Sequence, residues 1–491
     1  MTADHDRRWL ALAVIGIAQL MIILDASIVN IALPDAQTAL HISNADRQWA
    51  VTAYTLTFGG LLPLGGRVGD YLGRKRIFLM SLFGFAGASA LGGVAQNGGM
   101  LFGARAVQGV FAALLAPAVL SLITTTFTEA KERAKAFAVY GAISGTGGAL
   151  GLIAGGALTQ YFSWRWTLLV NTPIAIAVAF AAVPLLKESR AEGDRKFDIP
   201  GTVAVTAGLA LLVYGFSQAS VHGWSAPRTL AELIVAGVIL AQFVMYETRA
   251  KNPILPLRIV LDRNRGGAYG AFLLTTLGMF SSFLFLSYYF QGVLGFSPLK
   301  AGIAFLPFPL GVITSSTIAS KTLPRFGPRA LPMVGFTSAT LGMLWLTQLP
   351  AHSAYWLHVV PAMLLISLGM GQVFVPLSST ALTGVPNHDA GAASALVNTM
   401  QQIGGSLGIA LLNTIATSAT ASFAAAHHVL PTTAAAQVHG FSRAFSVSVG
   451  ILAFAFMVVA VLIRRPDAPA PAATENDHVI ELEPAALVGV G

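Results

Sequence analysis

The sequence predicts an all-α integral membrane protein, and three observations lead to this class. The chain has 491 residues, 55% of them hydrophobic and 10% charged, whereas a soluble domain carries about 25% charged residues. Fourteen apolar stretches reach the length of about 20 residues that a helix needs to cross a bilayer. The connecting segments are alternately rich and poor in Lys and Arg, as in multi-pass membrane proteins. Apolar stretches of this length also exclude a β-barrel, whose strands are short and alternate.

The predicted spans follow one another with mostly short connections. They cover residues 10–32, 48–67, 77–95, 100–122, 136–159, 166–186, 199–219, 230–249, 267–290, 302–320, 330–349, 357–379, 393–417 and 441–463. Asp198 is placed to cap the seventh helix, and Ala424–Gly440 is expected to form an outer loop. With the N-terminus inside, 23 of the 29 Lys and Arg fall in inner segments, 5 in outer segments and one within a span. This bias supports an even number of spans and two cytoplasmic termini.

The chain lacks residues that several classes of function require. The chain has no cysteine, which excludes disulfides, thiolate metal sites and a cysteine nucleophile. No Gly-rich phosphate loop with a Lys is present, so ATP hydrolysis is not expected. No metal-ligating cluster and no Ser/His/Asp grouping at a plausible depth occurs. The net charge of +8 lies in short loops, which does not suit nucleic-acid binding. We therefore expect no metal, no cofactor and no nucleic-acid partner.

One carboxylate, Asp25, lies inside the first span, in the stretch Leu24–Pro34. An acid at bilayer depth is costly unless it is paired, protonated or hydrated, so it indicates function. Arg105 lies in the fourth span and cannot lose its charge. At the helical rise of 1.5 Å per residue, Asp25 lies roughly 13 Å and Arg105 roughly 10 Å below the outer surface. The two form a candidate couple, with a snorkelling Arg105 as the alternative.

The loop after the second span combines glycine, acid and base. It contains Gly66, Asp70, Gly73, Arg74 and Lys75. The glycines allow a tight turn between helices, and Asp70 suits a helix N-terminus or a cation. The alternative is a basic loop that only sets topology.

A second basic stretch, Ser320–Arg329, follows the tenth span, and its Gly327 is in register with Gly73. It has no acid. The pair of stretches suggests two related halves, as in transporters built from repeats.

The fifth span carries a face of small residues, which predicts close helix packing and not a ligand site. Its glycines are Gly147, Gly151, Gly155 and Gly156. Polar side chains in other spans are candidates for lining a cavity, although bonding between helices is favoured for any one of them. The main candidates are Asn30, Gln108, Asn398, Gln401 and Gln402. Tyr288 and Tyr289 are expected in the aromatic belt at the outer surface.

These motifs resemble the signatures of the major facilitator superfamily. Gly66–Lys75 resembles its cytoplasmic loop, with Tyr71 in place of an Arg, and Arg105–Gly109 resembles its Arg-x-x-Gln-Gly motif. Gly141–Gly156 resembles the antiporter motif of the fifth helix, with Leu152 in place of the usual Pro. Leu24–Pro34, Trp164–Pro173 and Gly391–Gly405 are similar to stretches of the fourteen-span drug:proton antiporters, the EmrB/QacA type. The resemblance covers the chain to about residue 463.

The resemblance implies a major facilitator fold with 14 transmembrane helices. Residues 1–186 would form a six-helix bundle, 187–250 a linker and an inserted helix pair, 251–465 a second six-helix bundle, and 466–491 a disordered cytoplasmic tail. The implied activity is proton-coupled export of amphipathic drugs or antibiotics by alternating access in the bacterial cytoplasmic membrane. The proton gradient would replace a cofactor, Asp25 and Arg105 would couple protons, and the Gly66–Lys75 loop would hold the halves together.

Alternatives remain at this stage. The exported compound could be an endogenous metabolite, siderophore or lipid. A uniporter, or an enzyme acting on lipid-linked substrates, is a further possibility, although no catalytic cluster is visible. Beyond Asp25 no acid lies well inside a span, which predicts neutral, monocationic or zwitterionic substrates over dications. The expected partners are the substrate, protons and lipid. A periplasmic adaptor is left open, and otherwise the chain is expected to be a monomer.

Overall fold

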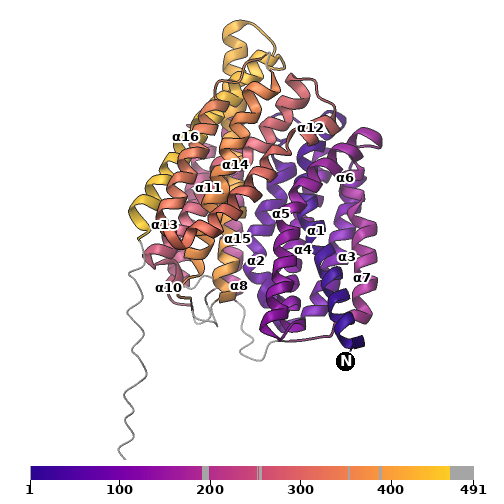
Figure 1. Ribbon diagram of the computed structural model, residues 1–491. Coiled ribbons are helices and arrows are strands. Elements are labelled where there is room, and N and C mark those ends of the chain that lie inside the picture. The colour runs from indigo at the N-terminus through magenta and orange to yellow at the C-terminus, as the bar shows by residue number, and fades with distance from the viewer. Residues whose placement is uncertain are drawn as a thin grey trace, which may run out of the picture.

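The computed structural model describes residues 2–190, 198–250, 253, 257–351, 354–385 and 390–464. Within that part of the chain every regular element is a helix and no strand occurs (Figure 1). The predicted tail, 466–491, lies outside the described residues, as do the surroundings of Gly66 and the side chain of Asp70. The all-α class predicted from the hydropathy is therefore confirmed for the described residues, because a chain in lipid must satisfy its backbone groups internally.

The helices follow the predicted spans in order. The first part of the chain forms α1 (Thr2–Ala39), α2 (Trp49–Leu72), α3 (Arg74–Gly93), α4 (Gly98–Thr126), α5 (Ala130–Tyr161), α6 (Trp166–Leu169) and α7 (Asn171–Leu185). Then come α8 (Ile199–His222) and α9 (Pro227–Glu247). The last part forms α10 (Leu257–Val260), α11 (Arg263–Tyr288), α12 (Pro298–Ala304), α13 (Pro307–Leu346), α14 (Val360–Leu382), α15 (Ala390–His427) and α16 (Ala434–Leu462), with π-helical turns η1 (Tyr289–Val293) and η2 (Tyr355–Val359).

Ten stretches in the described part of the chain are long and apolar enough to cross a membrane. Two shorter apolar helical stretches, Trp49–Leu62 and Pro200–Phe216, lie in α2 and α8. The longest stretch, Pro298–Leu346, covers the tenth and eleventh predicted spans together. The turn expected between those spans is confirmed as a kink at Gly327, where φ is 80° and the two helices that make up α13 meet. Gly73 separates α2 from α3 in the same way, at φ 112°, so the two positions in register both use the left-handed region.

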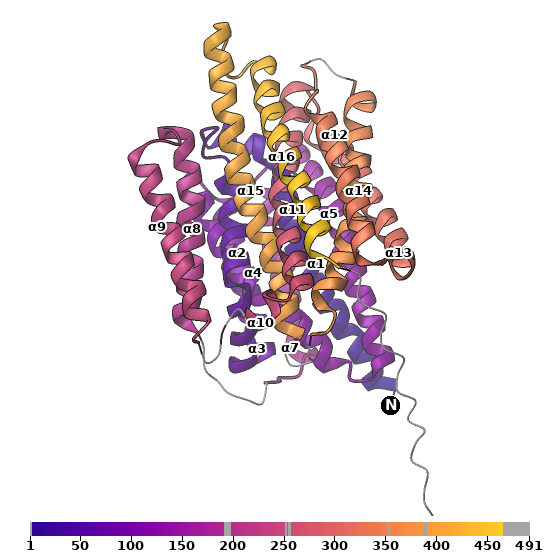
Figure 2. The same ribbon diagram turned by 90° about the vertical axis from the view of Figure 1, so that its left-hand side faces the viewer.

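Several helices extend beyond their predicted ends. The helix α1 continues through Pro34 to Ala39. The expected outer loop Ala424–Gly440 is mostly helical, since α15 ends at His427 and α16 begins at Ala434. The end of α15 rises above its neighbours in Figure 2. At the start of α8 the prediction is confirmed, because Asp198 accepts a hydrogen bond from the backbone N–H of Gly201 at 2.9 Å.

Helices distant in the sequence pack side by side. In the first part of the chain α1 packs on α5 and α7, and α2 packs on α4. In the last part α11 packs on α15 and α16, and α13 packs on α14. The pair α8–α9 lies at the edge of the molecule, where α8 contacts α2 and α15 (Figure 2). The division at residues 186 and 250 stays a prediction.

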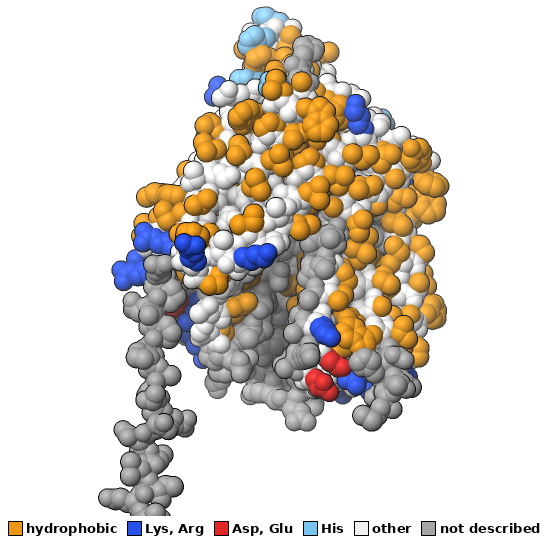
Figure 3. Space-filling model, in the orientation of Figure 1, with side chains coloured by type: hydrophobic (Ala, Val, Ile, Leu, Met, Phe, Trp, Pro, Cys, Tyr) orange, Lys and Arg blue, Asp and Glu red, His pale blue; other side chains and the backbone are white. Residues whose placement is uncertain are grey.

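Figure 3 shows hydrophobic side chains over most of the upper and middle surface, with Lys and Arg mainly toward the end where the N-terminus lies. Large apolar side chains such as Phe180 and Ile234 are two-thirds exposed. A soluble protein rarely exposes so continuous an apolar surface. This surface fits contact with lipid.

Candidate functional site

The structure brings Asp25 and Arg105 together in the interior of the first helices. Asp25 on α1 is 0% exposed and Arg105 on α4 is 1% exposed. One terminal nitrogen of Arg105 donates to Oδ2 of Asp25 at 2.5 Å. The similar depth predicted from the helical rise thus corresponds to a contact, and the snorkelling alternative for Arg105 is wrong.

Two amides complete the coordination of the carboxylate. Gln108 donates from Nε2 to Oδ1 of Asp25 at 3.1 Å, and Asn171 donates from Nδ2 to the same oxygen at 2.7 Å. Nε2 of Gln108 also lies 2.5 Å from the hydroxyl of Ser89 on α3. Three helices therefore meet at one carboxylate, both of whose oxygens accept hydrogen bonds, and α3 supports Gln108 from behind.

Arg105 keeps contacts that do not depend on Asp25. Its Nε donates to the carbonyl oxygen of Ala50 at 3.0 Å. The terminal nitrogen that donates to Asp25 also donates to Oε1 of Gln108 at 2.9 Å. The guanidinium carbon lies 4.3 Å from the centre of the Tyr54 ring, which is cation–π distance. Both charges are paired, and the cation would remain held if the carboxylate were neutralised.

Sequence reasoning missed Asn171 and Ser89. Asn171 is the first residue of α7, directly after the break that separates α6 from α7 at Val170. It belongs to Trp164–Pro173, a stretch that resembles the fourteen-span drug:proton antiporters, but that resemblance gives Asn171 no role. Ser89 carries no local signal, because a serine in a span more often bonds its own helix.

The remaining candidate polar residues lie elsewhere. Nδ2 of Asn30 donates to the carbonyl of Ala26 in its own helix at 3.2 Å. Asn398 is exposed, and Gln401 and Gln402 are half-buried on α15. The described hydrogen bonds of Asp25 are with Arg105, Gln108 and Asn171, so of the candidates only Gln108 belongs to the site. Tyr288 and Tyr289 are buried, which contradicts their expected place in the aromatic belt.

The loop after α2 is bound by the segment after α7. Backbone N–H groups of Lys75 and Arg76 each donate to the carboxylate of Glu188 at 3.1 Å, and that of Arg74 donates to the carbonyl of Ser189 at 3.0 Å. Nζ of Lys75 donates to the carbonyl of Val183 at 2.6 Å. Glu188 therefore satisfies the N-terminus of α3, a role that sequence reasoning considered for Asp70. The loop as a link between halves stays a prediction.

The glycines of α5 make close helix contacts. A Cβ on Gly151 would lie 2.8 Å from Cβ of Ser27, and one on Gly155 would lie 2.8 Å from the carbonyl oxygen of Ile28. Gly147 faces α1 in the same way, whereas Gly156 faces the start of α12 at 2.6 Å from the carbonyl oxygen of Pro298. This face therefore packs on both the first helix and the second half of the chain.

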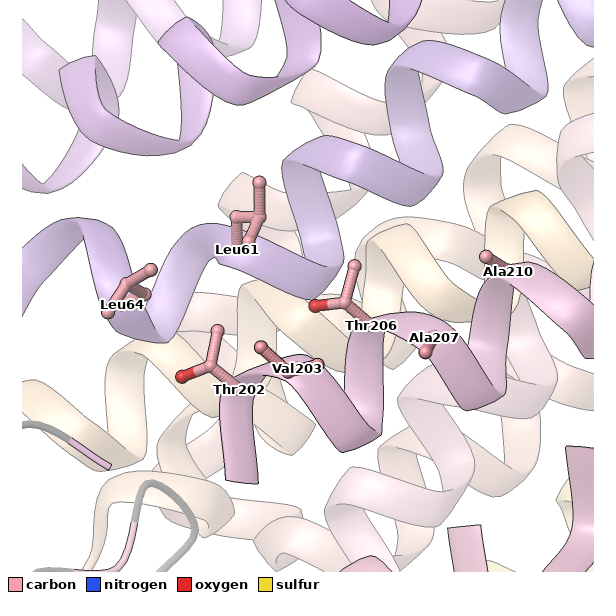
Figure 4. A pocket seen from close by; sticks show the side chains of 7 residues that line it. All are labelled: Leu61, Leu64, Thr202, Val203, Thr206, Ala207 and Ala210. Carbon is pink, nitrogen blue, oxygen red and sulfur yellow. The ribbon is translucent and has the colours of Figure 1, made fainter. Parts of the chain in front are cut away.

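A separate crevice of about 390 Å³ lies between α2 and α8 (Figure 4). It is lined by Leu61, Leu64, Thr202, Val203, Thr206, Ala207 and Ala210. None of these lining residues is charged. It therefore lacks the groups of the Asp25 site, and we do not assign it a chemical role.

Comparison with known proteins identifies a family that matches most of the chain. The model of the Major Facilitator Superfamily matches residues 15–409. The chain is 48% identical over 461 residues to the puromycin resistance protein pur8 of Streptomyces alboniger, with 93% of this chain and 92% of the relative covered. It is 36% identical over 482 residues to the cephamycin export protein CmcT of Amycolatopsis lactamdurans, with 97% and 96% covered.

A solved structure shares the fold at low identity. The bacterial homologue of the human lysosomal transporter Spinster, in an inward-facing and unoccupied conformation, superposes with a TM-score of 0.66 at 17% identity. The alignment covers 94% of this chain and 99% of that one. The family match, the relatives and the helical fold agree: the chain belongs to the Major Facilitator Superfamily and is a transporter, not an enzyme.

Proposed function

We propose that the protein exports amphipathic antibiotics or drugs across the bacterial cytoplasmic membrane by proton-coupled alternating access. The observation that carries the proposal is the fully buried pair of Asp25 and Arg105, 2.5 Å apart. An acid and a base inside a membrane are retained at a cost, and they mark ion or substrate pathways. The names of the relatives, which refer to puromycin resistance and cephamycin export, support an antibiotic as cargo.

The pair offers two discrete states. With Asp25 ionised, its two oxygens bind Arg105, Gln108 and Asn171, and α1, α4 and α7 are held together. A proton on Asp25 turns one acceptor into a donor and removes the counter-charge of Arg105. The differential stability of the two states then biases the helix packing. Binding and release of the proton on opposite sides would drive transport.

The contacts between the two parts of the chain suggest which side is closed. Between described residues, hydrogen bonds that join the two parts lie at the end opposite the N-terminus: Ser287 donates to the carbonyl of Asn30, and the hydroxyls of Thr55 and Ser406 are 2.6 Å apart. With the N-terminus in the cytoplasm, as the Lys and Arg bias favours, this end faces outward. The proposed state is therefore closed to the outside.

The fourteen-span arrangement is part of the proposal. Each of the fourteen predicted ranges overlaps a helix. Two of them fall on α13, one on each side of Gly327, and one range covers both α6 and α7. In this arrangement α8 and α9 are the inserted pair between two six-helix bundles, and both termini are cytoplasmic. Cysteine labelling of the connecting segments from each side of the membrane would test the count.

The buried charges also limit the substrate. Among the described acids only Asp25 and Glu247 are buried, and Glu247 is the last residue of α9. The carboxylate of Asp25 is already neutralised by Arg105. We therefore propose neutral, monocationic or zwitterionic substrates over dications, because a second cation would lack a buried counter-charge.

Reconstitution in proteoliposomes tests the function. The expected result is uptake or release of an amphipathic antibiotic that depends on an imposed pH gradient, with movement of protons in the opposite direction. A panel should include neutral, monocationic and dicationic compounds, together with labelled metabolites and lipids. Transport that is indifferent to the pH gradient would contradict the proton coupling, and a preference for dications would contradict the substrate class.

A further inference from the structure

The turn between α1 and α2 buries an arginine that topology alone would leave in water. Arg47 was predicted to lie in an outer segment, yet it is only 5% exposed. Burying a guanidinium requires partners that replace its hydration. The partners of Arg47 come from the second half of the chain, so this residue joins segments far apart in the sequence.

Two side chains contact Arg47, and each of them is held by a further group. Its Nε donates to Oδ1 of Asn413 on α15 at 3.1 Å. Its guanidinium carbon lies 4.1 Å from the centre of the Tyr288 ring on α11. The hydroxyl of Tyr288 in turn donates to Oε1 of Gln37 on α1. Nδ2 of Asn413 donates to the carbonyl of Asn44 at 3.2 Å. We call these residues the Arg47 cluster; they link α11 and α15 to the α1–α2 turn.

The cluster differs from the Asp25 site in its electrostatics. None of the ion pairs between described residues includes Arg47. The cation is held by an amide oxygen and an aromatic face, which are weaker partners than a carboxylate. Separation of the two halves would return the guanidinium to water and recover its hydration. The contact is thus specific in geometry and easily released.

We propose that Arg47 and Asn413 are positioning residues of the transport cycle, which hold this end of the molecule closed and let it open without breaking a buried ion pair. The proposal rests on alternating access in the proposed function. The closed state should therefore be destabilised when Arg47 keeps its charge and loses its acceptor. An unpaired buried charge is far more costly than a neutral side chain of similar size.

The absence of cysteine from the chain allows a clean reporter. Ser406 on α15 is fully buried, and its hydroxyl lies 2.6 Å from that of Thr55 across the same interface. The Ser406→Cys protein, purified in detergent, would be treated with a hydrophilic maleimide. Its labelling rate then reports the fraction of molecules in which this end is open. The measurement requires neither substrate nor protons.

Asn413→Leu in this background should label faster by about tenfold, which corresponds to about 1.4 kcal/mol. Adding Arg47→Met should return the rate to within about threefold of the parent, because the unpaired charge has been removed. Gln348→Leu, which replaces an exposed amide in the segment after α13, is the matched control and should leave the rate unchanged.

Two outcomes would overturn the proposal: an unchanged rate in Asn413→Leu, or a double variant that labels as fast as Asn413→Leu alone. Should Asn413→Leu fail to fold, Tyr288→Leu removes the other partner of Arg47, and the same rescue by Arg47→Met is expected. A failure of proton-driven transport would count against the proposed function and would leave these labelling rates as they are, so the two tests are separable.

Discussion

Replacement of Asp25 with asparagine is the sharpest test of the buried charge pair. The substitution keeps the shape of the side chain and removes its charge and its ability to release a proton. Asparagine offers one oxygen to Arg105, but its NH₂ group then faces the amide donors of Gln108 and Asn171, which bind the other carboxylate oxygen at 3.1 and 2.7 Å. The variant therefore creates a donor–donor contact in addition to an unbalanced cation.

The magnitude follows from these contacts. Removing one partner of a buried ion pair costs about 3–5 kcal/mol, and an unsatisfied buried donor costs about 1–3 kcal/mol. The two costs overlap, and Arg105 retains the carbonyl of Ala50 and the ring of Tyr54. We therefore expect a loss of about 3 kcal/mol, at the lower end of the ion-pair range. Adding Arg105→Gln should recover at least about 1 kcal/mol, since the site becomes neutral.

Two assays measure these effects. Thermal unfolding in detergent compares the parent, Asp25→Asn, Arg105→Gln and the double variant. Transport in proteoliposomes compares efflux driven by a pH gradient with exchange of labelled for unlabelled substrate. We expect Asp25→Asn to abolish the driven efflux and to retain part of the exchange. Full proton-coupled efflux by Asp25→Asn would refute the role of this carboxylate, and additive stability losses would refute the coupling of the pair.

Two further predictions concern other parts of the chain. Gly155→Val should lower the free energy of unfolding by about 1–3 kcal/mol through overpacking against α1, which a thermal unfolding scan would detect. Gly103→Val should be tolerated because no atom lies within 4 Å of its Cβ position. Glu188→Ala should destabilise the start of α3 by about 1 kcal/mol, which hydrogen exchange of that helix would detect, and Glu188→Gln should restore part of the loss.

Residues of the candidate site differ in how far the sequence could place them. Asp25 and Arg105 stand out because charges inside apolar spans are rare, and the helical rise fixes their depth. Gln108 follows from the same helix face as Arg105. Asn171 and Ser89 reach the site only through the way α7 and α3 pack, and no local pattern encodes that. The depth of a residue is thus readable along one helix, whereas its partner on another helix is not.

The sequence by itself determined the helical class, the order of the helices and the cap at Asp198. It also determined the glycine positions, Gly73 and Gly327, where helices end or kink. These features are local: an apolar segment in lipid must satisfy its own backbone groups, and a left-handed turn favours glycine. Only the tertiary structure decided that Arg47 and Tyr288 are buried against each other and that Asn171 and Ser89 belong to the Asp25 site. The physical reason is that the rotation and packing of helices depend on contacts between segments hundreds of residues apart.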